Sequence, residues 1–241
     1  MPPVVLTVLG CDGGFAGPGR ATSGYLVRWG ATAVLVDAGS GTLANLQRHI
    51  DLAELTAVVV SHEHPDHRVD LEGLGVAMAF EVGRRGIPVY APAGLQALVY
   101  HDFPGVYDWR VVADGDRAEV GGLALSFSRT DHGPETLAVR VDAGGRSLGY
   151  SADTAPGWSL QALGAGLDLA LCEATWPASR PGEGRHLSAS EAGTMAREAG
   201  AARLVLTHRW PTVPAVAVAG EAADAYGSGV ELAAVGVSYE V

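Results

Sequence analysis

The pattern of apolar and polar residues predicts strands alternating with helices, without an internal repeat. Short apolar runs bounded by glycine or polar residues are typical of buried strands. They occur at residues 4–9, 25–29, 33–37, 57–60, 118–129, 136–142, 146–151, 167–172, 203–207 and 238–241. Helices are expected between residues 41 and 49 and over 71–82, 95–100, 160–163 and 188–199. The last of these opens at Ser188 with Glu191 three residues later, which is the spacing of a capping box.

This pattern favours an α/β protein in which two sheets pack together with helices outside, as a single domain over residues 1–241. Hydrophobic residues make up 48% of the chain, which is enough for a substantial core. No apolar run approaches the roughly 18 residues of a membrane helix. The first strand has no basic flank, so we expect no signal peptide and a cytoplasmic location. Two distant cysteines, Cys11 and Cys172, fit buried free thiols in a reducing compartment.

The candidate chemistry begins directly after the apolar run at 57–60. Residues 61–67 read Ser-His-Glu-His-Pro-Asp-His. Side chains two apart in an extended chain point the same way, so His62 and His64 can bind one ion together. Asp66 and His67 then face a second ion after the chain turns. Three imidazoles and a carboxylate suit a metal such as zinc, and we favour this over a polar loop that is His-rich by chance.

Further polar residues lie at the ends of other predicted strands. His132 follows the run at 118–129, Asp153 follows 146–151 and His208 follows 203–207. His186 lies just before the helix at 188–199. Each residue alone is more often a hydrogen-bonded structural residue than a ligand. Together they form the pattern by which an α/β scaffold builds a site at its strand ends.

These residues carry a resemblance to the metallo-β-lactamase fold superfamily over nearly the whole chain. Its His-x-His-x-Asp-His motif is matched by residues 62–67, and its later ligands by His132, Asp153 and His208. The chain is similar to the ribonuclease Z-like branch in residues 9–11, 23–25, 150–154, 172–175 and 186–189. In length and in residues 66–71 it is similar to short bacterial atypical class II cyclic-nucleotide phosphodiesterases. The resemblance implies a four-layer αββα sandwich.

The resemblance also implies the roles of the site residues. Two divalent metal ions are expected, as Zn²⁺ or alternatively Mn²⁺ or Fe²⁺. The first would be bound by His62, His64 and His132, the second by Asp66, His67 and His208, with Asp153 bridging them. Asp66 is also expected to act in catalysis. His186 would donate a proton to the leaving oxygen, and Glu173 would orient the His186 ring. The alternative is that His186 is an ordinary surface histidine at the start of the helix. Asp37 would support the metal loop without binding an ion.

The implied reaction is hydrolysis of a small phosphodiester, such as a cyclic nucleotide, by a hydroxide between the two ions. A net charge of −11, with all 16 basic residues scattered arginines, argues against a large RNA partner. Only 20 residues separate His132 from Asp153, where ribonuclease Z carries its transfer-RNA-binding arm. A secreted β-lactamase is disfavoured by the missing signal peptide and by Asp153.

Several alternatives stay open at this stage. They are a ribonuclease Z-like RNA endonuclease, a lactonase, a thioesterase and a non-catalytic metal-binding protein. Aromatic residues at 101–109, Trp176 and Trp210 could shape the pocket or simply pack. A homodimer is expected from the resemblance alone.

Overall fold

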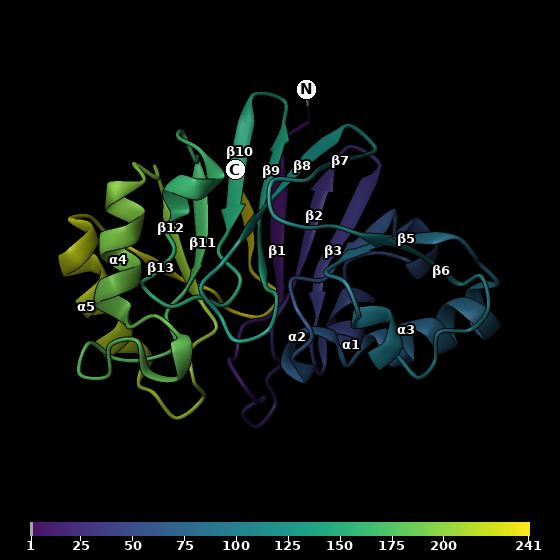
Figure 1. The fold of residues 1–241 in the computed structure, drawn as a ribbon, viewed down its shortest axis with the longest axis horizontal. Helices are drawn as coiled ribbons and strands as arrows, with labels where there is room; N and C mark the ends of the chain where they lie inside the picture. Colours follow the sequence, from purple (N-terminus) through teal and green to yellow (C-terminus); the bar gives the residue numbers. More distant parts are fainter. Residues whose placement is uncertain (1) are drawn as a thin grey trace.

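The computed structural model describes residues 2–241, and it is built around two seven-stranded sheets that face each other (Figure 1). The first sheet has the order β14-β1-β2-β3-β4-β5-β6. Its strands are β1 (Val5–Gly10), β2 (Gly24–Trp29), β3 (Thr32–Ala38), β4 (Ala57–Val59), β5 (Ile87–Ala91), β6 (Tyr107–Val111) and β14 (Ser238–Glu240). Strands β14 to β3 pair antiparallel, and β3 to β6 pair parallel.

The second sheet repeats this mixed plan with the order β13-β12-β11-β10-β9-β8-β7. Its strands are β7 (Arg117–Val120), β8 (Leu123–Arg129), β9 (Leu137–Ala143), β10 (Arg146–Tyr150), β11 (Leu169–Glu173), β12 (Leu204–Thr207) and β13 (Glu231–Leu232). Strands β7 to β10 pair antiparallel, and β10 to β13 pair parallel. Parallel strands place their carboxyl ends, and the loops that leave them, at one edge of each sheet.

Helices cover the outer face of each sheet (Figure 1). On the first sheet lie α1 (Thr42–Leu46), α2 (Pro65–Arg68), α3 (Leu71–Ala77), the π-helical turn η2 (Met78–Val82), and the 3₁₀ turns η1 (Leu52–Glu54) and η3 (Leu95–Leu98). On the second lie α4 (Ala189–Glu198), α5 (Ala215–Tyr226), and the 3₁₀ turns η4 (Leu160–Leu163) and η5 (Glu183–Arg185). The capping box predicted at the start of α4 is present, with Ser188 accepting from the Glu191 amide.

Three hydrophobic clusters join these layers. One fills the space between the sheets and includes Tyr25, Phe127 and Tyr150. A second packs the first sheet against α1 and α3, around Leu46, and a third packs the second sheet against α4 and α5, around Ala192. Helix, sheet, sheet and helix therefore form four layers, which confirms the predicted fold class.

Several predicted elements differ in detail. The run at 118–129 is two strands, because Gly121 and Gly122 adopt left-handed φ angles of 55° and 89° and turn the chain. The predicted helix at 95–100 is only the short turn η3. The last three residues of the aromatic stretch 101–109 belong to β6, an edge strand whose neighbour β5 was not predicted.

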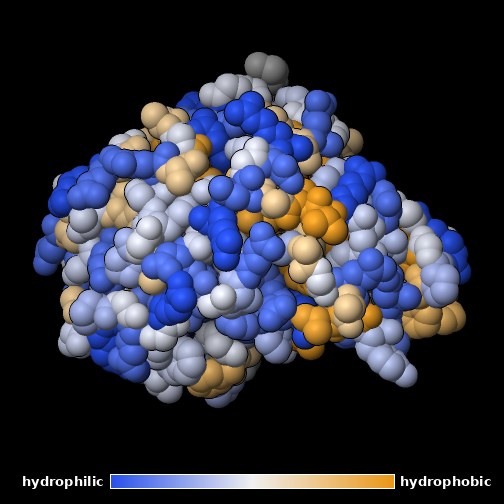
Figure 2. Space-filling model, in the orientation of Figure 1, coloured by the Kyte–Doolittle hydropathy of each residue, from blue (hydrophilic) through white to orange (hydrophobic). Residues whose placement is uncertain are grey.

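The face of the molecule in Figure 2 is mainly hydrophilic, and its larger apolar patches lie between the middle of the view and the side of α3 and β6. Exposed apolar side chains of that region include Val76, Phe80, Leu98 and Val111. Among residues 2–241, no helix is long and apolar enough to cross a membrane. Both cysteines are free and buried, as the sequence predicted.

Candidate metal centre

The histidine-rich segment lies where β4 ends and α2 begins. His62 lies in the short loop after β4, and His64, whose backbone is extended, is the N-cap of α2. Pro65 occupies the first helical turn, where its missing N–H costs nothing and its fixed φ favours the helix. Asp66 and His67 therefore follow on a helical turn, so the chain bends between the two pairs of candidate ligands as the sequence predicted.

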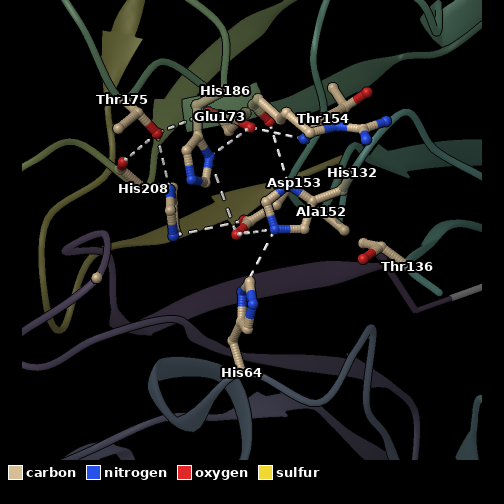
Figure 3. A network of polar contacts seen from close by, with 12 residues as sticks. His64, His132, Thr136, Ala152, Asp153, Thr154, Glu173, Thr175, His186 and His208 are labelled. Atoms are coloured by element: carbon tan, nitrogen blue, oxygen red, sulfur yellow. Dashed lines mark hydrogen bonds and ion pairs between the residues drawn. The ribbon is translucent and has the colours of Figure 1, made fainter. Parts of the chain in front are cut away.

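The second half contributes its residues from the carboxyl ends of three strands. His132 follows β8, Asp153 follows β10 and His208 follows β12. Figure 3 shows His64 approaching from the first half, while His132, Asp153, His186 and His208 approach from the second. The structure thus brings all the predicted site residues to one place between the two sheets.

The donor atoms of the seven predicted ligands fall into two adjoining groups, and a third group joins Asp153 and His208 to His186. Within each group, one donor atom from every residue lies within 4.8 Å of the others. The first group consists of His62, His64, His132 and Asp153, and the second of Asp66, His67 and His208. Apart from Asp153, which the sequence analysis expected to bridge, these are the two sets that it assigned to separate ions.

Asp153 stands between the two groups. Its Oδ2 is 3.5 Å from His62 Nε2 and 3.8 Å from His132 Nε2. Its Oδ1 is 3.3 Å from His67 Nε2 and 3.4 Å from His208 Nε2. Only 1% of the residue is exposed, and neither oxygen has a hydrogen-bond partner among the described residues. An unpaired buried carboxylate is costly, so this arrangement fits a site built for cations.

The spacing of the donors also fits a metal ion. Ligand atoms about 2.0–2.2 Å from a tetrahedrally bound zinc lie about 3.3–3.6 Å from one another. His208 Nε2 and Asp66 Oδ2 are 3.3 Å apart, and His67 Nε2 and Asp66 Oδ2 are 3.5 Å apart. His132 Nε2 and His64 Nδ1 are 3.3 Å apart. Divalent metal ions are therefore the natural occupants of this centre.

The opposite ring nitrogens are anchored by the protein. His67 Nδ1 lies 2.7 Å from Asp37 Oδ2, and His208 Nδ1 lies 2.9 Å from Thr175 Oγ1. His132 Nδ1 donates to the Arg185 carbonyl oxygen over 3.1 Å. Anchoring one nitrogen in this way turns the other toward the centre, which is how metal-binding histidines are normally oriented.

Asp37 is the hub of this support in the first half. Its Oδ2 accepts hydrogen bonds from Ser61 Oγ at 2.9 Å and from Tyr150 Oη at 2.7 Å, besides the contact with His67. Ser61 Oγ in turn lies 3.0 Å from His62 Nδ1. Asp37 thus holds one histidine from each group without facing the centre itself, in agreement with the supporting role predicted for it.

His186 lies beside the centre and is held by Glu173. Its Nδ1 is 3.1 Å from Glu173 Oε1 and 4.0 Å from Asp153 Oδ2. Burial by itself lowers the pKa of His186, but the charge and hydrogen bond of Glu173 outweigh it and raise this pKa to about 9. Glu173 is fully buried and also accepts from the Thr154 amide at 2.6 Å. The predicted pairing of His186 with Glu173 is therefore present.

The electrostatics of the cluster follow from its buried charges. Burial lowers the pKa of His62 well below its ordinary value, with the neighbouring His67 adding to the effect. For His67, burial also acts downward, but the carboxylates of Asp153, Asp66 and Asp37 raise the pKa well above the ordinary value. The three carboxylates therefore favour a positively charged occupant of this centre.

Strained backbone is concentrated at this centre. Among residues 2–241, the non-glycine residues with left-handed φ are Asp37, Ala152, Arg185 and His208, at 57°, 51°, 62° and 54°. Each is a site residue or directly precedes one. Such conformations cost free energy and persist where packing holds the backbone, as is common at functional sites.

The sequence did not reveal the contribution of the glycine-rich loop at 10–24. The Gly14 amide donates to Asp66 Oδ2 over 2.7 Å, and the Gly13 amide donates to the Arg209 carbonyl oxygen over 3.1 Å. A side chain at Gly13 would collide with the backbone and ring of His208. The only sequence signal was the density of glycines, which permits such close approach but does not say to what.

The amino-acid sequence was compared with known proteins. Residues 32–209 match the family described as Beta-lactamase superfamily domain. The chain belongs to this superfamily. Together with the fold and the cluster of histidine and aspartate donors, this membership identifies the protein as a metal-dependent hydrolase of the metallo-β-lactamase fold.

Superfamily members similar to this chain come from several bacteria. An uncharacterised protein of Mycobacterium tuberculosis is 38% identical over 85% of this chain and 80% of its own length. The probable metallo-hydrolase YhfI of Bacillus subtilis is 32% identical over 84% of this chain and 86% of its own. The YhfI crystal structure covers 100% of both chains with a TM-score of 0.93 and 29% identity. A ribonuclease Z of Mycolicibacterium paratuberculosis is 29% identical over 88% of both chains.

Proposed function

We propose that this metal-dependent hydrolase is a dinuclear phosphodiesterase that acts on a small phosphodiester such as a cyclic nucleotide. The observation that carries the proposal is the position of Asp153, whose two unpaired oxygens each face a different group of donors. A carboxylate placed in this way suits a bridge between two ions. A pair of ions suits hydrolysis of a phosphodiester, because negative charge on both the attacking and the leaving oxygen must be stabilised during the displacement.

The proposed ligand roles follow the two groups of donor atoms. His62, His64 and His132 would hold one ion and Asp66, His67 and His208 the other. Asp153, whose oxygens lie near histidines of both groups, would contribute to both. Ions bound there would supply Lewis acidity and an activated water at neutral pH. Zinc fits the imidazole-rich donor set, and manganese or iron would accept it as well.

His186 is the proposed general acid. Its Nδ1 faces Glu173, which keeps the ring oriented and favours its protonated form. Its side chain is 14% exposed, so the ring borders the opening of the centre rather than lying beneath it. From this place it can give a proton to the departing oxygen of the substrate. Asp153, His186 and His208 can also be grouped as a metal site, so a ligand role for His186 is the competing assignment.

A small substrate is favoured by the chain between His132 and Asp153. This stretch forms β9, a tight turn at Gly144 and Gly145, and β10, all within the second sheet. The net charge of −11, without a lysine, also disfavours a long polyanion. We therefore place a cyclic nucleotide ahead of an RNA substrate.

The test is hydrolysis of 3′,5′-cyclic AMP by protein of measured metal content. We expect turnover with two ions bound per chain and loss of both turnover and metal in Asp153→Ala. His186→Ala should keep its metal but lose about 10²–10⁴-fold in turnover, the range typical of acid–base help. His49→Ala, a histidine change outside the centre, is the matched control and should retain full activity.

The opposing outcomes are specific. If fully metallated protein leaves cyclic nucleotides intact but processes a transfer-RNA precursor, a lactone or a thioester, the substrate class proposed here is wrong. If metal content falls in His186→Ala, this histidine is a ligand and not the general acid. Two tightly bound ions in Asp153→Ala would remove that residue from the bridge.

A further inference from the structure

A row of aromatic side chains lies on the Asp66 and His208 side of the metal centre. The ring of Phe15 meets the ring of Trp210 edge to face, with centroids 5.2 Å apart. Trp210 in turn lies 4.9 Å from Trp176 at an interplanar angle of 32°. The guanidinium group of Arg180 covers the Trp176 ring at 3.6 Å. We call Phe15, Trp210 and Trp176 the aromatic row.

Hydrogen bonds tie the aromatic row to the centre. Phe15 follows Gly14, whose amide donates to Asp66 Oδ2. The Trp210 amide donates to the carbonyl oxygen of Thr175, the residue whose hydroxyl anchors His208. The aromatic row therefore has a fixed position relative to the candidate ligands.

Close packing holds the end of the row that carries Phe15. Gly14 has a left-handed φ of 73°, and a side chain there would meet the Trp210 ring. The loop thus lies directly against Trp210, and only glycine permits this approach. The Phe15 backbone is consequently fixed although its side chain reaches the surface.

Exposure distinguishes the two ends of the row. Trp176 is 7% exposed and its Nε1 donates to the Glu183 carbonyl oxygen over 2.7 Å, so its role is packing. Phe15 is 47% exposed. A large aromatic ring left in water, one residue from a hydrogen bond to a candidate ligand, offers a face on which a planar group can stack.

We propose that Phe15, backed by Trp210, is the stacking platform for the base of a cyclic nucleotide whose phosphodiester lies at the metal centre. The inference rests on the proposed function, and it assigns a binding site to the base, at the opposite end of the substrate from the phosphodiester. In a cyclic nucleotide only the ribose separates the phosphate from the base, and in this protein Phe15 directly follows Gly14, whose amide donates to Asp66 Oδ2. Stacking accepts every base, so the platform predicts recognition of nucleotides with weak preference among bases.

The experiment compares two substrates that differ only in the base. They are 3′,5′-cyclic AMP and the 3′,5′-cyclic phosphate of 1-O-methylribose, which has no base. Phe15→Ala should raise KM for cyclic AMP by about 5- to 100-fold, the effect expected for one lost base stack, and leave the baseless substrate unchanged. Phe15→Trp should restore the wild-type KM. Phe80→Ala is the matched control, since Phe80 is 72% exposed and packs on Phe103 away from the aromatic row.

Calorimetric binding of the Rp phosphorothioate analogue of cyclic AMP separates this inference from the proposed function. We expect a Kd that rises in Phe15→Ala by the same factor as KM. If Phe15→Ala changes neither Kd nor KM, or changes both substrates equally, the platform is wrong while the phosphodiesterase stands. If wild-type protein binds the analogue through Phe15 but hydrolyses neither substrate, the proposed function fails and the platform stands.

Discussion

At the scale of single residues, the spacing of histidines and aspartates in the sequence located the metal centre but not the residues that hydrogen-bond to its candidate ligands. His62, His64 and His67 were predicted because three imidazoles in six residues have few explanations other than a metal. Thr175 and Tyr150 could not be predicted, because a threonine or tyrosine acquires this role only through the partner that folding brings to it. Phe15 was hidden for the same reason, since nothing in a glycine-rich loop shows which side chain stays exposed.

Ala152 gives a prediction at this scale. It is buried and left-handed, with φ at 51°, which costs about 1–2 kcal/mol for a residue with a Cβ. Ala152→Gly relieves this strain, and the relief offsets the destabilisation caused by a more flexible unfolded chain. The free energy of unfolding should therefore stay within about 1 kcal/mol of the wild-type value or rise above it. Ala152→Val should lower it by more than about 2 kcal/mol, because a β-branched residue tolerates this region poorly.

Urea denaturation of the two variants measures the effect. Ala138→Gly is the control, because Ala138 is equally buried but lies within β9 with ordinary extended backbone. There the same change should destabilise by about 0.5–1 kcal/mol or more. Equal losses in Ala152→Gly and Ala138→Gly would show that the left-handed conformation carries no strain.

At the scale of elements, apolar runs predicted the strands that are buried on both faces. The helix α5 was missed because its alanine- and valine-rich sequence contains Gly220 and has no polar N-cap to mark its start. The strand β5 was missed because Pro88 interrupts its apolar run. Neither element supplies a candidate ligand, so missing them did not affect the prediction of the metal centre.

Two tyrosines, one from each sheet, join the sheets by hydrogen bonding to a residue of the opposite sheet. Tyr25 reaches from β2 to Thr207 Oγ1 in the second sheet over 2.6 Å, and Tyr150 reaches from β10 to Asp37 in the first over 2.7 Å. Their rings are adjacent, with centroids 5.0 Å apart. Because Asp37 also holds His67, the bond of Tyr150 connects the inter-sheet core to the metal centre.

We predict different consequences for the same chemical change at these two positions. Tyr150→Phe should cost about 1–3 kcal/mol, because it deprives a buried carboxylate of a donor, and should weaken metal binding by about 10-fold or more through His67. Tyr25→Phe should cost only about 0.5–1.5 kcal/mol and leave metal affinity nearly unchanged. Competition with a chromogenic chelator measures the affinity. Equal affinities in the two variants would contradict the role given to Asp37.

At the scale of the whole molecule, the sequence predicted that two halves would meet at the centre, and they do. The first half supplies the segment 61–67, and the second supplies Asp153 and His208 from the ends of different strands. Local patterns cannot say which strand ends become neighbours, and the superfamily resemblance supplied that step. Ions bound here would therefore link the two sheets in addition to taking part in catalysis.

This linkage predicts that metal removal destabilises the whole protein. An ion present at 1,000 times its Kd stabilises the folded state by about 4 kcal/mol, which for a chain of this size is roughly 8–16 °C in Tm. Removal also leaves the buried Asp153 oxygens without a hydrogen-bond partner, in a site to which both halves contribute, so we expect both halves to unfold together. Calorimetry with and without a chelator should show one transition that moves down as a whole. Asp153→Ala is the control, because it should lose most of the metal-dependent shift. A chelator-treated protein that keeps its Tm, or an Asp153→Ala variant that keeps the full shift, would place the ions outside the contacts between the halves.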